Sequence, residues 1–149
     1  MVDVKPDTTH VLLAEDDDDD YYIFSLAIEQ IPVTVLLTRA ENGELLLKLL
    51  DEKTPDILFL DLYMPCKDGH QCLREIRANK KYDSLPIIIY SSLSDLRNIE
   101  FAYRQGSNLY AIKPSSFQEL KAVLEKILTI DWKKMLYFPP LTDFVLNPQ

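Results

Sequence analysis

The chain contains 149 residues, 47% of them hydrophobic, which is enough to bury the core of one ordinary domain. Its net charge of -8 differs from that of a general nucleic-acid-binding protein, which presents a basic surface, so we expect no direct binding to nucleic acid. No apolar run approaches the ~20 residues of a membrane helix, and residues 1–9 lack a signal-peptide pattern. We therefore expect no membrane association and a cytoplasmic location.

Short apolar runs alternate with amphipathic stretches along the chain. The apolar runs predict strands at residues 10–14, 33–38, 56–60, 85–90 and 109–112. The amphipathic stretches predict a first helix that follows an acidic run and ends near residue 30, and further helices at residues 42–50, 68–79, 94–104 and 116–130.

The order of these elements predicts an α/β fold. Five strand–helix units in series imply a parallel sheet with helices on both faces. Continuous apolar runs such as Ile57 to Leu60 and Ile87 to Tyr90 suit strands that are buried on both faces. We expect residues 1–130 to form one domain without an internal repeat.

Residues 131–149 form an aromatic and proline-rich tail that resembles no effector domain. Ordered aromatic side chains need an apolar surface to pack against. Two surfaces are open to the aromatic residues of the tail, which are Trp132, Tyr137, Phe138 and Phe144. One is the surface of the tail's own domain, which is the hypothesis favoured here. The other is a partner subunit, which would make the protein a homodimer.

Charged and hydroxyl side chains occur where the predicted strands end. Glu15 and Asp16 follow the first strand and Asp61 follows the third, whereas Ser91 and Lys113 follow the fourth and fifth. In a doubly wound sheet, ligands bind at the carboxyl ends of the strands, so the three carboxylates converge if the first and third strands are neighbours. Crowded carboxylates stay ionised comfortably only beside a cation, and their oxygens favour Mg²⁺ or Ca²⁺.

This set of residues fits phosphoryl transfer. A Mg²⁺ ion held by few carboxylates keeps waters and readily takes a phosphate oxygen. Lys113 supplies a positive charge and Ser91 a hydroxyl donor, and phosphoryl transfer depends mainly on positioning and charge neutralisation. Asp61 is then the carboxylate nucleophile that forms an acyl phosphate.

Each of these features also has a simpler interpretation. An acidic run such as Asp17 to Asp20 is commonly a solvated helix start, where the helix dipole favours negative charge. A single Asp after a strand is usually a turn or cap residue, and a single Lys-Pro pair usually belongs to a loop. The specificity of the prediction comes from the ordered set of all four positions.

Four segments resemble the motif blocks of the receiver (response-regulator) family of two-component signalling. The metal-binding block resembles VLLAEDD at residues 11–17, and the phosphorylation-site block resembles ILFLDLYMPCKDG at residues 57–69. The hydroxyl block resembles IIIYSS at residues 87–92, and the lysine block resembles YAIKP at residues 110–114. The resemblance covers about residues 10–128. It implies a flavodoxin-like fold, a doubly wound five-stranded parallel sheet in the order 2-1-3-4-5 flanked by five helices.

The resemblance implies a Mg²⁺ site at the phosphorylation site. Asp61 is the implied phosphoacceptor and also a ligand of the ion. Asp16 is implied to bind Mg²⁺ directly, and the backbone carbonyl of Tyr63 is the third protein ligand. Glu15 is implied to hold a metal-bound water.

The same resemblance implies a phosphorylation switch. Ser91 contacts the phosphoryl group and moves toward it, while Lys113 pairs with a phosphoryl oxygen. Tyr110 stands at the family's switch aromatic position, where the ring swings inward as the hydroxyl moves. The peptide bond between Lys113 and Pro114 is expected to be cis, as is typical of the family.

The implied function is that of a stand-alone response regulator rather than an enzyme with a separate substrate. A histidine kinase or a histidine phosphotransfer protein would phosphorylate Asp61. Since no effector domain is expected, the output would be contact with an unidentified downstream protein or onward phosphotransfer. Tyr63 and Leu93 are bulky residues beside the site, which suggests that they shield the acyl phosphate from water and lengthen its lifetime.

Two other functions compete with this one. A module that binds metal without being phosphorylated has no need for the complete set of Asp16, Asp61, Ser91 and Lys113. A phosphatase with an aspartyl nucleophile typically carries a second acid two residues after the nucleophile, and Tyr63 occupies that position here.

Overall fold

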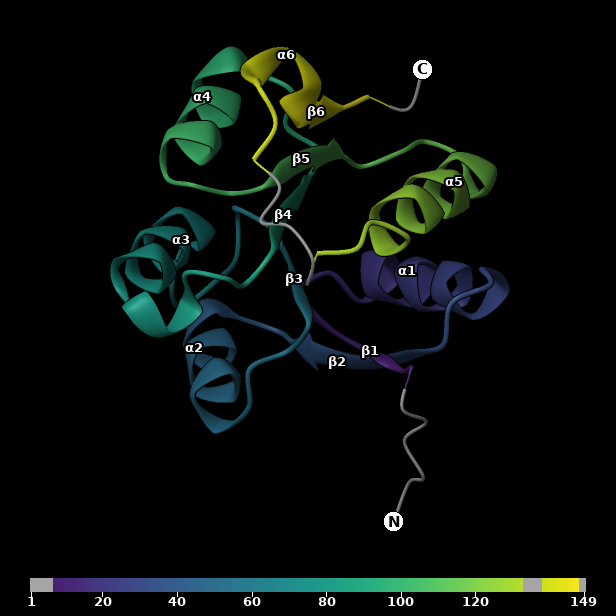
Figure 1. The fold of residues 1–149 in the computed structure, drawn as a ribbon, viewed down its shortest axis with the longest axis horizontal. Helices are drawn as coiled ribbons and strands as arrows, with labels where there is room; N and C mark the ends of the chain where they lie inside the picture. Colours follow the sequence, from purple (N-terminus) through teal and green to yellow (C-terminus); the bar gives the residue numbers. More distant parts are fainter. Residues whose placement is uncertain (1–6, 133–137, 148–149) are drawn as a thin grey trace.

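The structure, a computed structural model of the chain, describes residues 7–132 and 138–147. Their strands form one sheet in which all neighbouring strands are parallel, in the order β2-β1-β3-β4-β5-β6 (Figure 1). The strands are β1 (Thr9–Ala14), β2 (Val35–Ala40), β3 (Ile57–Leu60), β4 (Ile87–Ser91), β5 (Leu109–Ile112) and β6 (Val145–Leu146).

The helices cover both faces of the sheet. One face is covered by α1 (Asp18–Gln30) and α5 (Phe117–Leu128), and the other by α2 (Gly43–Glu52), α3 (Gly69–Ala78) and α4 (Leu96–Arg104) (Figure 1). Two short helical turns complete the fold, η1 (Lys80–Tyr82) and α6 (Leu141–Phe144). The predicted doubly wound α/β architecture and the strand order 2-1-3-4-5 are confirmed.

The predicted number of strands is wrong, because the tail adds a sixth strand at the edge of the sheet. Strand β6 pairs in parallel with β5, with Val145 opposite Tyr110 and Leu146 opposite Ala111. A strand of two residues carries no periodic pattern, and it follows a proline-rich segment that favours loops. Sequence periodicity therefore could not reveal it.

Side-chain caps fix where the five long helices begin. In each case the capping side chain accepts a hydrogen bond from a backbone N–H of the first turn, which has no partner inside the helix. The predicted starts of most of these helices fell on or close to the caps themselves, which are Asp17, Asn42, Asp68, Asp95 and Ser116. The helices therefore begin where the sequence suggested, within a residue or two.

Two apolar layers, one on each face of the sheet, hold the helices in place. Strands β3 and β4 are buried at every position, as their continuous apolar sequences predicted. One layer lies under α2, α3 and α4, and the other lies under α1 and α5. Since both faces are covered, polar side chains can reach a ligand mainly at the ends of the strands.

The aromatic tail contributes to the first of these layers through Phe144, which is fully buried. The Phe144 ring lies 5.1 Å from that of Tyr103 on α4 and 6.3 Å from that of Tyr110 on β5. Trp132 packs on the other layer, and its ring N–H donates to the carbonyl of Ile127. The tail therefore packs on its own domain at these two positions, whereas Tyr137 lies outside the described residues.

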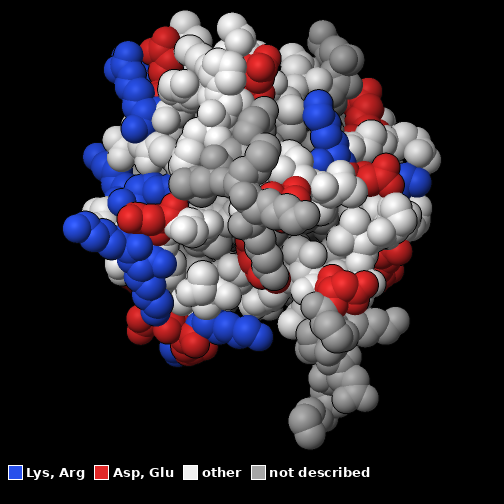
Figure 2. All heavy atoms as spheres, viewed as in Figure 1, with Lys and Arg blue, Asp and Glu red and all other residues white. Residues whose placement is uncertain are grey.

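The surface carries charges of both signs. On the face in Figure 2, Lys and Arg gather mainly over the side that carries α2, α3 and α4, where Asp and Glu are interspersed among them. This face therefore lacks the continuous basic surface of a nucleic-acid-binding protein. Among the described helices, none has the length and apolar character needed to cross a membrane.

Candidate functional site

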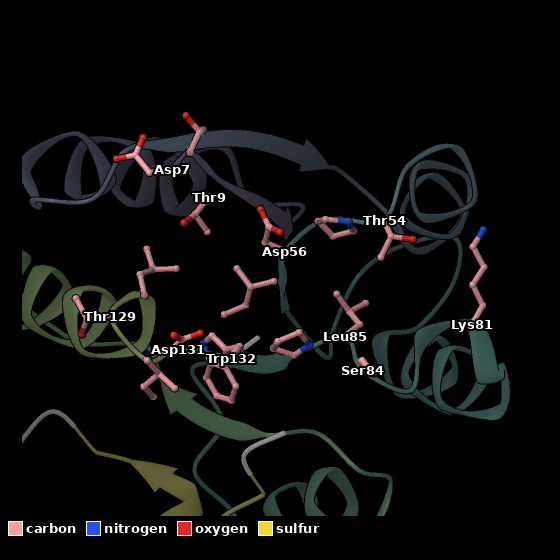
Figure 3. A pocket seen from close by; sticks show the side chains of 16 residues that line it. Asp7, Thr9, Thr54, Asp56, Lys81, Ser84, Leu85, Thr129, Asp131 and Trp132 are labelled. Carbon is pink, nitrogen blue, oxygen red and sulfur yellow. The ribbon is translucent and has the colours of Figure 1, made fainter. Parts of the chain in front are cut away.

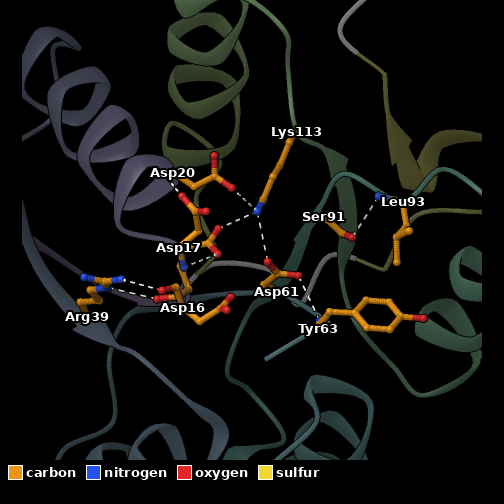
Figure 4. A network of polar contacts seen from close by, with 10 residues as sticks. Asp16, Asp17, Asp20, Arg39, Asp61, Tyr63, Ser91, Leu93 and Lys113 are labelled. Carbon is orange, nitrogen blue, oxygen red and sulfur yellow. Dashed lines mark hydrogen bonds and ion pairs between the residues drawn. The ribbon is translucent and has the colours of Figure 1, made fainter. Parts of the chain in front are cut away.

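The structure brings the predicted site residues together at the carboxyl ends of the central strands (Figure 4). Glu15 and Asp16 follow β1 directly, and Asp61 follows the neighbouring strand β3. Each of these three carboxylates offers an oxygen that lies within 4.8 Å of those of the other two. Their convergence depends on the pairing of β1 with β3, which the prediction required.

Lys113 is the cation of this site. Its Nζ lies 2.7 Å from Glu15 Oε1, 2.8 Å from Asp20 Oδ2 and 3.1 Å from Asp61 Oδ2. Burial alone would lower the pKa of Lys113, but the bonds to Asp20 and Glu15 and the charge of Asp61 raise it above its ordinary value. Lys113 therefore stays charged and offsets part of the negative charge around Asp61.

Glu15 is a buried carboxylate, with 1% of the residue exposed. Burial raises its pKa to about 7, although the bond to Lys113 acts in the opposite direction. Its Oε1 pairs with Lys113 Nζ at 2.7 Å and accepts no hydrogen bond from any other group in the described part of the chain. A buried carboxylate oxygen with a free lone pair fits a role in holding a cation or its bound water.

Asp61 is held in a fixed orientation. Its residue is 7% exposed, its Oδ1 accepts a hydrogen bond of 3.1 Å from the backbone N–H of Tyr63, and its Oδ2 faces Lys113. Gly69, at the start of α3, lies so close that a Cβ there would collide with the backbone oxygen of Asp61. The glycine therefore lets the start of α3 lie against the backbone at the end of β3.

The Tyr63 side chain is turned away from Asp61 (Figure 4). It is 55% exposed, and its ring meets the ring of His70 on α3 edge-on at 5.4 Å. In this orientation the Tyr63 ring does not cover the Asp61 carboxylate. The shielding of an acyl phosphate by these two side chains stays a prediction.

Ser91, the last residue of β4, and Tyr110, on β5, both bond the loop that follows β4. Both residues are almost completely buried, and Ser91 Oγ accepts a hydrogen bond of 3.1 Å from the N–H of Leu93. The Tyr110 hydroxyl donates to the carbonyl of Leu93 at 2.8 Å. Burial raises the pKa of Tyr110 to about 12, so the hydroxyl remains a donor at neutral pH. The two proposed switch residues are therefore joined through Leu93.

The peptide bond between Lys113 and Pro114 is trans, since the described residues contain no cis peptide bond. The predicted cis bond is wrong. The two forms of a bond before proline differ by only about 0.5–1 kcal/mol in intrinsic free energy, so the sequence alone does not decide between them.

The acidic run is more than a solvated helix start. Asp17 caps α1 by accepting from the N–H of Asp20, Asp18 forms an ion pair of 2.8 Å with Arg39, and Asp20 pairs with Lys113. The sequence held a signal for Asp20, because it precedes the buried Phe24 by four residues and so shares the inward face of the helix. Nothing in the sequence pattern indicated Arg39.

A hollow lies at the opposite end of the sheet from the acidic site, near the amino ends of the strands (Figure 3). It has a volume of about 770 Å³, and its lining includes Thr9, Asp56, Lys81 and Trp132. None of the predicted site residues lines it. The residues that the sequence singled out therefore lie at the acidic site and not in this hollow.

Comparison with known proteins places this geometry in a family context. The sequence model of the response regulator receiver domain matches residues 11–125. A relative in Bacillus subtilis (strain 168), described as the probable C4-dicarboxylate response regulator DctR, is 34% identical over 116 residues. That match covers 78% of this chain but 50% of the relative, so the chain matches only half the length of DctR.

Solved structures show the same fold. The receiver domain of the Francisella response regulator 1452 is 30% identical, with a TM-score of 0.67 over 85% of this chain and 98% of that one. The phosphorylated cyanobacterial phytochrome response regulator RcpA is 23% identical, with a TM-score of 0.75 over 80% of this chain and 91% of that one. The second likeness is one of fold alone.

Proposed function

Because the chain belongs to the response regulator receiver domain family of two-component signalling, we propose that it accepts a phosphoryl group on Asp61 with the help of bound Mg²⁺. One observation carries the proposal: the Asp61 carboxylate lies with Glu15 and Asp16 in one acidic group, within 3.1 Å of Lys113. Members of this family act as signalling modules rather than conventional enzymes.

The proposed reaction transfers one phosphoryl group between two proteins. A carboxylate oxygen of Asp61 attacks the phosphorus of a phosphohistidine on a histidine kinase or a phosphotransfer protein. The new O–P bond forms as the N–P bond breaks, and the histidine nitrogen leaves with the bonding electron pair. Lys113, which already lies beside Asp61, is placed to pair with a phosphoryl oxygen.

The donor set fits Mg²⁺. Glu15, Asp16 and Asp61 supply only oxygen ligands, and Asp16 is exposed, so water can complete the coordination. In the proposed arrangement Asp16, Asp61 and the carbonyl of Tyr63 bind the ion, and Glu15 holds one of its waters. Bound Mg²⁺ would neutralise charge on the transferring phosphoryl group.

The proposed readout begins at Ser91. A phosphoryl group on Asp61 favours the conformation in which Ser91 contacts it, and this would disturb the hydrogen bond that Ser91 Oγ accepts from Leu93. The Tyr110 hydroxyl bonds the carbonyl of the same Leu93, so it is placed to respond. Stand-alone action in the cytoplasm, through contact with a downstream protein or onward phosphotransfer, stays a prediction, as does a homodimer.

The test is the mass of the intact protein after incubation with Mg²⁺ and acetyl phosphate. We expect one adduct of about 80 Da on the wild type, the mass of a phosphoryl group, and none on Asp61→Asn. Asp19→Asn removes the same charge from an exposed position on α1 and should leave the adduct intact. A wild type that binds Mg²⁺ but gains no adduct would favour the module that binds metal without phosphorylation.

A further inference from the structure

Arg39, the penultimate residue of β2, donates hydrogen bonds to the backbone of Glu15 and Asp16, which form the acidic turn that follows β1 (Figure 4). Its Nε donates to the carbonyl of Glu15 at 3.0 Å, and its Nη2 donates to the carbonyl of Asp16 at 3.2 Å. The planar guanidinium thus holds two successive peptide units at once, which the single ammonium of a lysine cannot do in the same way. These peptide units set the direction of both side chains.

Other contacts fix the guanidinium itself. The Arg39 side chain is only 15% exposed, and it forms an ion pair of 2.8 Å with Asp18 in the first turn of α1. Its guanidinium carbon also lies 4.6 Å from the centre of the Tyr21 ring, in a cation–π arrangement. Arg39 therefore ties β2, the acidic turn and the start of α1 into one unit.

From this geometry we infer that Arg39 is a positioning residue, which holds the acidic turn so that Glu15 and Asp16 can bind a divalent cation. The inference rests on the proposed Mg²⁺ site and adds a residue that touches neither the ion nor the phosphoryl group. Removing a residue that orients metal ligands without touching the metal typically lowers the metal affinity by about 10- to 100-fold.

The charge of Arg39 works against its positioning effect, because a nearby positive charge repels a divalent cation. That repulsion is weak here, since the guanidinium pairs with Asp18 and has Glu41 3.8 Å away. Two substitutions separate the effects. Arg39→Gln removes both the charge and the forked hydrogen bonds, whereas Arg39→Lys keeps the charge and loses the fork. Positioning predicts weaker Mg²⁺ binding in both variants, and a charge effect predicts tighter binding in Arg39→Gln.

The experiment is a calorimetric titration of each purified full chain with Mg²⁺ alone. We expect the Mg²⁺ dissociation constant to rise about tenfold in both Arg39 variants. Arg104→Gln, which removes an exposed positive charge at the end of α4, should match the wild type. At saturating Mg²⁺, the yield of the acetyl phosphate adduct should return to the wild-type level, which a loss of catalytic contact would not allow.

The outcomes separate the inference from the proposed function. If the wild type binds no Mg²⁺, the proposed function fails. If the wild type binds Mg²⁺ and both Arg39 variants bind within twofold of it, or if Arg39→Gln binds more tightly, the positioning role of Arg39 is overturned. An equal loss in Arg104→Gln overturns it as well. Thermal unfolding without Mg²⁺ shows which variants are folded, and if Arg39→Gln is not, Arg39→Lys decides.

Discussion

Lys113 and Arg77 are both largely withdrawn from solvent, and their surroundings differ in kind. Lys113, at the carboxyl ends of the strands, has carboxylates as its ion-pair partners. Arg77, on α3, bonds only neutral oxygens within the described chain: the carbonyls of Gly106, Tyr82 and Leu85 and the side-chain oxygen of Asn108. Burial lowers the pKa of Arg77 to about 10, so it remains charged at neutral pH.

The difference teaches what each cation can be used for. A cation among carboxylates neutralises their charge. A second cation can therefore neutralise the same carboxylates, and a new anion can pair with the first cation in their place. A cation among neutral carbonyls satisfies hydrogen-bond acceptors that lie between structural elements, and no ligand can replace its geometry. Lys113 therefore belongs to a site that can change state, whereas Arg77 fastens α3 to the loops before β4 and β5.

The largest effects are expected when Lys113 and Arg77 are each replaced with methionine. Arg77→Met should lower the free energy of unfolding by about 5 kcal/mol, because several acceptors lose their donor at once. Lys113→Met should cost less, and Mg²⁺ should restore part of the loss because it also neutralises Glu15 and Asp61. The measurement is urea denaturation of both variants with and without Mg²⁺.

Recovery of Arg77→Met by Mg²⁺, or a Lys113→Met variant that is indifferent to Mg²⁺, would contradict the distinction between the two cations. If Arg77→Met does not fold, Arg77→Lys retains a positive charge and part of the bonding and takes its place.

The second prediction concerns the tail. Mg²⁺ should not restore the stability that a tail substitution removes, just as it should not restore the loss in Arg77→Met. Phe144→Ala should lower the free energy of unfolding by about 4 kcal/mol, because it empties a fully buried position between Tyr103 and Tyr110. Phe138→Ala is the matched control, since Phe138 is 48% exposed and should change stability by less than about 1 kcal/mol. Equal effects of the two substitutions would show that the packing of Phe144 is not what anchors the tail.

The third and smallest prediction is a pH dependence that arises at Glu15 in the carboxylate site. Glu15 has a pKa of about 7 in the folded, metal-free protein against 4.5 in an unfolded chain, so the folded state binds its proton more tightly. Its contribution to stability is complete below pH 4.5 and is lost as the pH rises through 7, by at most about 3 kcal/mol.

Denaturation without Mg²⁺ between pH 4.5 and 8 measures this contribution. Glu15→Gln cannot ionise at that position and should show a flatter profile than the wild type, with higher relative stability at pH 8. Parallel profiles for the two proteins would contradict a raised pKa at Glu15.

The sequence indicated which side chains would lie together because Glu15, Asp61, Ser91 and Lys113 each directly follow or end an apolar strand. Asp61 comes after a strand buried at every position, and Ser91 is the last residue of another. Once the strands are placed, parallel pairing brings their carboxyl ends together, so positions distant in sequence converge without any further information.

The contacts of Arg39 and Arg77 and the existence of strand β6 could not be predicted, because they depend on tertiary contacts that leave no local sequence pattern. Arg39 and Arg77 work through long side chains that reach other elements, and their spacing in the sequence does not reveal their partners. Strand β6 exists because Phe144 finds a buried place beside β5, not because two residues favour extended structure. The tail was therefore predicted only as an aromatic segment in need of a surface.

The sixth strand also has a consequence for solubility. It leaves the sheet with unequal outer edges, β2 with six residues and β6 with two. A very short edge strand gives another chain little backbone to pair with, which discourages association between sheets. Without residues 138–147, the apolar strand β5 would become the outer edge and could template pairing between molecules. The tail thus covers part of the apolar β5 edge and limits the backbone that another chain could pair with there.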